Sequence, residues 1–247
     1  MPDASDLLPV LHDTASAVRR ALDALSDWGP AGTRPGQYRS DLVADAAAVE
    51  VLTGAGLRVL SEESGLTGPA GALLAVLDPV DGSTNASMGI PWYATSVCVL
   101  DDAGPLAAVV VNQASGVRFE ATRGGGTRCD GKRLAPRATT ELADAVVGVS
   151  GWPPRHLGWR QYRALGAAAL DLCAVASGAF DAYVDCTRPA AHGPWDYLGG
   201  MLVCTEAGAV IVDGAGLDLV TRAHADRRSP VAAATKPLLS ALLGKIS

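Results

Sequence analysis

The stretch LDPVDGSTN at residues 77–85 places two carboxylates, a glycine and two hydroxyls next to one another. The apolar run at 72–77 that leads into it has the length of a buried strand. Asp78 and Asp81, three positions apart across a tight turn, can point to the same side, where carboxylate oxygens suit a hard divalent cation such as Mg2+. A turn held by aspartate side chains is the structural alternative.

The residues around these acids favour a phosphate site beside the metal. Pro79 and Gly82 are predicted to end the strand. Ser83 and Thr84 are typical of a helix start, whose free N–H groups would then face an anion. The sequence therefore predicts a combined metal and phosphate site after this strand.

The bulk composition is that of a folded globular protein. Of 247 residues, 49% are hydrophobic and 19% charged, enough for one large domain or two modest ones. The formal net charge of -6 opposes general attraction to a polyanion, so we expect no nucleic-acid partner.

Several features predict a reducing, cytoplasmic setting. The five cysteines include no Cys-x-x-Cys pair, and an odd number cannot form a complete set of internal disulfides. Residues 1–6 carry acids where a secretory signal would carry bases, and no apolar run approaches the roughly 18 residues of a membrane span. We therefore expect neither export nor membrane insertion.

Periodicity predicts helices and strands along the whole chain. The expected helices are 6–27, 41–54, 162–176, 195–207 and 237–243. The expected strands are 57–60, 72–77, an antiparallel meander of 95–100, 106–111 and 117–121, and then 146–150, 179–185, 210–213 and 231–234. A shift in composition near 137–141 predicts two domains, 1–138 and 139–247.

Acidic residues also occur at other junctions between apolar segments. Glu62 and Glu63 follow the strand at 57–60, and Asp196 begins an apolar helix. Taken alone, Asp196 is explained as a first-turn acid that complements the helix dipole.

Together these segments resemble the inositol monophosphatase family of Mg2+-dependent, Li+-sensitive phosphatases, which share a fold with fructose-1,6-bisphosphatase. The D-P-x-D-G-[ST]-x-N signature is complete at 78–85, and Trp195-Asp196 is followed by Gly199 and Gly200 as in the second signature. The family-like segments are E-E-S at 62–64, A-x-x-G-x-G at 121–126, G-A-A-A-L at 166–170 and E-A-G at 206–208.

The resemblance implies a layered αβαβα sugar-phosphatase fold, of α+β or α/β class, with mixed sheets between helices. It implies an N-terminal domain that binds metal and phosphate and a C-terminal domain that completes the site. Two or three Mg2+ ions would be held by Glu62, Asp78, Asp81, Asp196 and the backbone carbonyl of Val80. The N–H groups of Gly82 and Ser83 would bind phosphate.

The resemblance also assigns the acid that orients the attacking water. Asp41 matches this family acid and would act together with Glu62 and the Ser83 hydroxyl. Hydrolysis would then be direct, without a phosphoenzyme intermediate. The segment 41–45 lacks the usual threonine, however, so Asp45 is the alternative.

The substrate side departs from the inositol-specific pattern. Inositol-specific members of the family carry an acid about seven positions before the W-D aspartate, where this chain has Pro189. Arg188 and His192 stand nearby, so we expect one of them to contact a different polar group of the substrate, such as a second anion or a carboxylate. Asp81 and Asp196 are the other residues expected to contact the substrate.

These observations predict a Mg2+-dependent phosphomonoesterase that acts on a small phosphorylated polyol, cyclitol or sugar by direct in-line attack of a metal-activated water. A histidinol-phosphate or 3'-phosphonucleotide phosphatase is the alternative within the family. A non-catalytic, metal- or ligand-binding regulatory homologue is the alternative of another class. A homodimer is implied by the resemblance alone.

Overall fold

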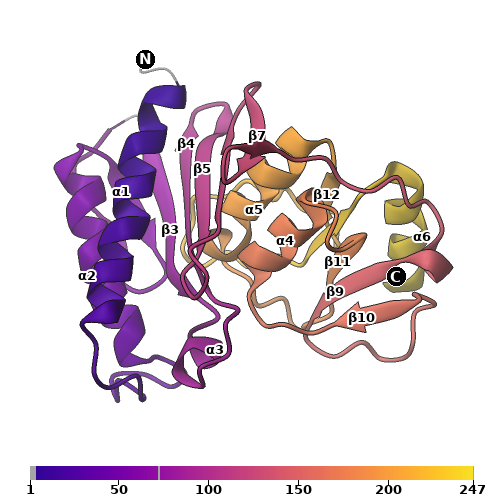
Figure 1. The fold of residues 1–247 in the computed structure, drawn as a ribbon, viewed down its shortest axis with the longest axis horizontal. Coiled ribbons are helices and arrows are strands. Elements are labelled where there is room, and N and C mark those ends of the chain that lie inside the picture. Colours follow the sequence, from indigo (N-terminus) through magenta and orange to yellow (C-terminus); the bar gives the residue numbers. More distant parts are fainter. Residues whose placement is uncertain (1–3, 72, 247) are drawn as a thin grey trace.

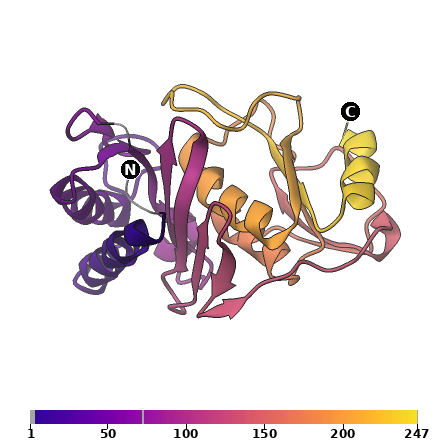
Figure 2. The ribbon, with the colours of Figure 1, turned by 90° about the horizontal axis from the view of Figure 1, so that it is seen from above.

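The structure is a computed structural model that describes residues 4–71 and 73–246. Residues 1–3, and position 72 of the apolar run, lie outside the described residues. Two helices, a sheet, two helices, a second sheet and a final helix follow one another as layers across the molecule (Figure 1). The view from above shows the N-terminal and C-terminal helices at opposite ends of this stack (Figure 2). The predicted layered fold is therefore confirmed.

The first layer consists of α1 (Ala4–Asp23) and α2 (Arg39–Gly54). Their buried faces, with Leu11, Val18 and Leu52 wholly inaccessible, pack on one side of the first sheet. The predicted helix at 6–27 ends earlier, at Asp23. None of the helices in the described ranges is both long and apolar enough to cross a membrane.

The first sheet has eight strands in the order β2-β1-β3-β4-β5-β6-β7-β8. Their bounds are β1 Arg58–Ser61, β2 Gly65–Thr67, β3 Leu74–Asp81, β4 Ala94–Asp101, β5 Gly104–Asn112, β6 Arg118–Thr122, β7 Gly126–Cys129 and β8 Lys132–Arg133. β1 and β3 are parallel, and the other neighbours are antiparallel. The predicted meander is β4, β5 and β6.

Strand β3 does not end at Pro79, as the sequence predicted, but continues to Asp81. Pro79 has no N–H to give to a ladder, and the register with β4 shifts between Asp78 and Asp81. The carbonyl of Pro79 still accepts a hydrogen bond from the Thr95 hydroxyl, at 2.9 Å. The irregular pairing therefore carries both acids of the motif on the strand itself.

The middle layer consists of α4 (Ala168–Ala176) and α5 (Pro194–Ala207), which pack on each other. The second sheet has the order β10-β9-β11-β13-β12. Its strands are β9 Val146–Ser150, β10 Gln161–Arg163, β11 Ala182–Asp185, β12 Val210–Asp213 and β13 Pro230–Ala233. Its outer face is covered by α6 (Lys236–Ile246), and the short elements α3 (Ser83–Ser87) and η1 (Leu142–Asp144) complete the described part.

The predicted helix at 162–176 is wrong over its first residues. Gln161–Arg163 form β10, parallel to β9, and α4 begins only at Ala168. Gly166 separates the two because its φ of +83° is left-handed and cannot continue a helix.

Two glycines allow α5 to lie close to its neighbours. A Cβ at Gly199 would stand 2.6 Å from the hydroxyl oxygen of Ser96 on β4, and a Cβ at Gly200 would stand 2.6 Å from Cβ of Leu172 on α4. The small residues of the second signature therefore set the position of the helix that begins at Trp195-Asp196.

We expect Gly200→Ala to lower the free energy of unfolding by about 1–3 kcal/mol, because the new methyl overpacks the contact with Leu172. Gly244→Ala in α6 is the control, since a Cβ there meets nothing within 4 Å. It should raise stability by about 0.5–1 kcal/mol through helix propensity. Urea unfolding of both variants measures this, and an equally tolerated Gly200→Ala would contradict the packing argument.

Candidate active site

Three predicted metal ligands meet at one point between the first sheet and the middle layer. Carboxylate oxygens of Glu62, Asp78 and Asp196 all lie within 4.8 Å of one another. Glu62 directly follows β1, where its N–H donates to the Leu77 carbonyl at 3.1 Å. Asp78 lies on β3, and Asp196 is the third residue of α5. Residues far apart in the sequence are thus brought together by two sheet strands and one helix start.

The backbone at the start of α5 fixes the carboxylate of Asp196. Pro194 suits the first helical position, where no N–H is needed. The N–H of Gly193 donates to Asp196 Oδ2 at 2.6 Å. One carboxylate oxygen therefore holds the helix start, and the other is available to a ligand.

The two aspartates of the motif are also held by backbone donors. Asp78 Oδ1 accepts the N–H of Val80 at 3.0 Å, and Asp81 Oδ2 accepts the N–H of Ala169 in α4 at 2.7 Å. Both side chains are almost wholly buried. Asp81 thus connects β3 to the middle layer. The role of the Val80 carbonyl as a metal ligand stays a prediction.

Burial and repulsion between carboxylates raise the pKa values of acids at this site. Burial, and then the neighbouring carboxylates with Asp196 first, raise the pKa of Glu62 to about 9. The pKa values of Asp78 and Asp81 are raised well above the usual range, first by burial and next by the charges of Glu62 and Asp196 respectively. Oxygen-only donors that repel one another are the set that Mg2+ suits, so the residues fit this ion.

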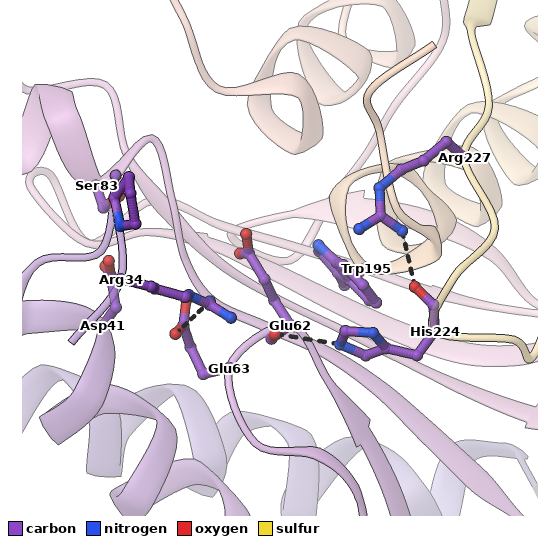
Figure 3. A pocket seen from close by; sticks show the side chains of 10 residues that line it. Arg34, Asp41, Glu62, Glu63, Ser83, Trp195, His224 and Arg227 are labelled. Carbon is purple, nitrogen blue, oxygen red and sulfur yellow. Dashed lines mark hydrogen bonds and ion pairs between the residues drawn. The ribbon is translucent and has the colours of Figure 1, made fainter. Parts of the chain in front are cut away.

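A cavity of about 350 Å³ adjoins this cluster. Figure 3 shows Ser83 and Asp41 on one side of Glu62, and Trp195, His224 and Arg227 on the other. Arg34, Pro35, Gly36 and Glu63 complete the wall. The wall therefore combines the acids with cationic side chains.

The structure places Asp41, and not Asp45, on the cavity wall. Asp41 Oδ2 accepts the N–H of Tyr38 at 2.8 Å at the start of α2. Burial raises the pKa of Asp41 to about 6, against the lowering effect of this hydrogen bond. Asp45 lies one turn further along α2 and accepts the hydroxyl hydrogen of Ser61.

The turn between β3 and α3 needs its glycine. Gly82 has a φ of +86°, and a Cβ there would stand 3.0 Å from the Trp92 carbonyl oxygen. Ser83 follows on the cavity wall. Asn85 fixes the same turn by donating from Nδ2 to the carbonyls of Trp92 at 2.8 Å and Leu165 at 2.6 Å.

Neither of the two predicted substrate-binding cations lines this cavity. Arg188 lines a separate cavity with Trp152 and donates to the Thr187 carbonyl at 2.9 Å. His192 lies beside the cluster, with Nδ1 3.5 Å from Asp196 Oδ2 and Nε2 3.7 Å from Asp185 Oδ1. Burial lowers the pKa of His192, but these carboxylates, Asp196 foremost, raise it to about 9 overall.

The basic side chains on the cavity wall are Arg34, His224 and Arg227, which the sequence analysis did not single out. Arg34 lies in the loop before α2 and pairs with Glu63 at 2.6 Å. His224 and Arg227 lie between β12 and β13. No motif marks these residues, because only the fold brings their loops to the acids.

The layered fold and the partly buried acid cluster fit a phosphatase, and comparisons with known proteins agree. Residues 41–247 match the inositol monophosphatase family. A fructose-1,6-bisphosphatase from Pyrococcus furiosus is 32% identical over 208 residues, 82% of this chain and 80% of that protein. A fructose-1,6-bisphosphatase/inositol-1-monophosphatase from Archaeoglobus fulgidus is 30% identical over 223 residues, 85% of this chain and 86% of that protein.

Among solved structures, a hypothetical Pyrococcus horikoshii protein with similarities for inositol-1 monophosphatase superposes with a TM-score of 0.85. It is 26% identical, and the match covers 98% of this chain and 97% of that one. The chain belongs to the inositol monophosphatase family.

The raised pKa of Glu62 predicts a pH-dependent stability for the metal-free protein. The folded state holds the proton of Glu62 up to about pH 9, whereas the unfolded chain releases it near its ordinary value of about 4.3. The free energy of unfolding, measured in a chelator, should therefore fall as the pH rises from about 6 to 9.

Glu62→Gln should flatten this decline, because it removes both a titrating group and a charge that repels Asp78. Glu50→Gln on the exposed face of α2 is the matched control, since Glu50 is not among the charges that raise the pKa of Glu62, and it should keep the wild-type slope. Thermal or urea unfolding at a series of pH values measures all three proteins. A Glu62→Gln slope equal to that of the wild type would contradict the assignment.

Proposed function

We propose that the protein is a Mg2+-dependent phosphomonoesterase that hydrolyses a small phosphorylated polyol, cyclitol or sugar. The observation that carries the proposal is the convergence of Glu62, Asp78 and Asp196 beside a cavity that also presents Asp41 and Ser83. Acids at this density, which outnumber the one histidine beside them, suit a metal-bound phosphate ester.

Different residues would bind the metal ions, orient the attacking water and bind the phosphate. Glu62, Asp78, Asp81, Asp196 and the Val80 carbonyl would hold two or three Mg2+ ions, which when bound supply an activated water and neutralise charge on the ester. Asp41, ionised above about pH 6, would orient the attacking water with Ser83 and Glu62. The N–H groups of Gly82 and Ser83 would bind the phosphate in line with that water.

Related proteins named as a fructose-1,6-bisphosphatase and a fructose-1,6-bisphosphatase/inositol-1-monophosphatase support a sugar or cyclitol ester as the substrate class. Histidinol phosphate and 3'-phosphonucleotides remain alternatives for the test. The position of Asp41 on the cavity wall favours turnover over a purely regulatory role. The proposal includes the division at 138/139, a cytoplasmic homodimer and inhibition by Li+.

Asp196→Asn tests the proposal. It removes a charge from the cluster but keeps an oxygen that can accept the Gly193 N–H. We expect phosphate release with Mg2+ to fall by about three orders of magnitude, since a metal ligand is lost, while the unfolding midpoint stays within a few degrees. The assay panel contains inositol 1-phosphate, fructose 1,6-bisphosphate, histidinol phosphate and a 3'-phosphonucleotide.

Asp13→Asn on the exposed face of α1 is the control and should keep full activity. Wild-type turnover in Asp196→Asn would overturn the role of this acid. Mg2+ binding to the wild type without release of phosphate from any ester would favour the regulatory alternative.

A further inference from the structure

Arg227 differs from the other arginine on the cavity wall because it forms no ion pair with a carboxylate among the described residues. Arg34 is neutralised by Glu63 at 2.6 Å, and the next residue, Arg228, pairs with Asp226 at 3.2 Å. Within residues 4–71 and 73–246, no carboxylate oxygen lies within 4.0 Å of the Arg227 guanidinium. A half-buried guanidinium that forms no ion pair with a carboxylate, although its charge acts on neighbouring Asp226, therefore faces the cavity.

The hydrogen bonds of Arg227 leave one particular edge of its guanidinium group free. Nη1 donates to the carbonyls of His224 at 2.7 Å and Asp226 at 2.8 Å. Nε and Nη2 have no acceptor in the part of the chain that the structure describes. Their N–H groups lie on the same side of the planar group, the side that binds both oxygens of a carboxylate or phosphate.

The free edge is held in place by the residue next to a predicted metal ligand. The guanidinium carbon of Arg227 lies 5.1 Å from the ring centroid of Trp195, a cation–π distance. The His224 ring stacks on the same indole at 4.6 Å, and its Nε2 lies 3.3 Å from the Glu62 carbonyl oxygen. These contacts hold the β12–β13 loop against Trp195, which precedes Asp196, and against the backbone of Glu62.

The cavity presents Asp41 and Ser83 at one end and Arg227 at the other. Figure 3 shows Asp41 and Ser83 across Glu62 from Arg227. At about 350 Å³ the cavity is large enough for a small ligand rather than a phosphate group alone. A substrate whose ester lies over the acid cluster therefore extends its remaining groups along a wall that carries Trp195 and Arg227.

We propose that the Nε–Nη2 edge of Arg227 binds a second oxyanion of the substrate, a phosphate or a carboxylate, and so selects esters that carry one. This inference rests on the proposed phosphatase function. It assigns the recognition of the second anion to Arg227 in the β12–β13 loop, in place of Arg188, which lines another cavity.

The experiment compares matched esters with Mg2+ present. Fructose 1,6-bisphosphate is paired with fructose 1-phosphate, and 3-phosphoglycerate with glycerol 3-phosphate, so that the pairs separate a phosphate from a carboxylate. We expect the wild type to favour the oxyanion-bearing member of at least one pair by about tenfold or more in kcat/KM. Arg227→Gln should lower that ratio about tenfold, chiefly by raising KM.

Two further variants separate binding from support of the loop. Arg227→Lys keeps the charge but loses the paired N–H donors of Nε and Nη2. Its kcat/KM ratio for the two members of a pair should therefore fall between those of the wild type and Arg227→Gln. Arg222→Gln changes an arginine of the same loop that lines a different cavity and donates to the Asp101 carbonyl. It should keep the wild-type ratio, and the unfolding midpoint of each variant is measured alongside.

Equal kcat/KM for both members of each pair in the wild type would overturn the inference. A ratio that is unchanged in Arg227→Gln would also overturn it, as would equal losses on both members of a pair together with a lower unfolding midpoint. In each of these cases the phosphatase proposal stands. If the wild type hydrolyses no ester with Mg2+, the proposed function fails and this inference fails with it.

Discussion

Mutual repulsion among partly buried carboxylates is the constraint on which the site depends. Glu62, Asp78 and Asp196 come within 4.8 Å of one another, and burial together with this repulsion keeps the pKa values of the first two high. An arrangement that costs stability without a ligand persists only if the surrounding backbone enforces it. Here N–H groups of Val80 and Gly193 hold two of the acids directly.

The layers of the fold provide that enforcement. Glu62 and Asp78 come from the parallel pair β1 and β3 of the first sheet, while Asp196 comes from α5 in the middle layer. The depth at which α5 sits is set by Gly199 against Ser96 and by Gly200 against Leu172. Packing at two glycines therefore controls the distance between acids supplied by different layers.

Local patterns in the sequence predicted the parts of this account that depend on neighbouring residues. The motif at 78–85, the meander and the acids at strand ends follow from periodicity and turn chemistry. Asp41 and Asp45 are one helical turn apart on the same face of α2. The sequence could not separate them, and in the structure Asp41 lines the cavity while Asp45 accepts the hydroxyl hydrogen of Ser61.

The features that the sequence did not reveal arise from contacts over long distances in the chain. The three-residue strand β10 is specified mainly by its pairing with β9. Pro79 stays within β3 because a shift in register with β4 accommodates it. Arg227 lies over the ring of Trp195 on the cavity wall, and neither spacing nor periodicity records such a contact.

Anomalous diffraction from crystals soaked in Mn2+, a substitute for Mg2+ with the same preference for oxygen ligands, tests the central claim most directly. The account predicts a peak among the carboxylate oxygens of Glu62, Asp78 and Asp196, at a ligand distance of roughly 2.0–2.3 Å. A data set with no peak there, or with Mn2+ bound only at surface acids, would contradict it.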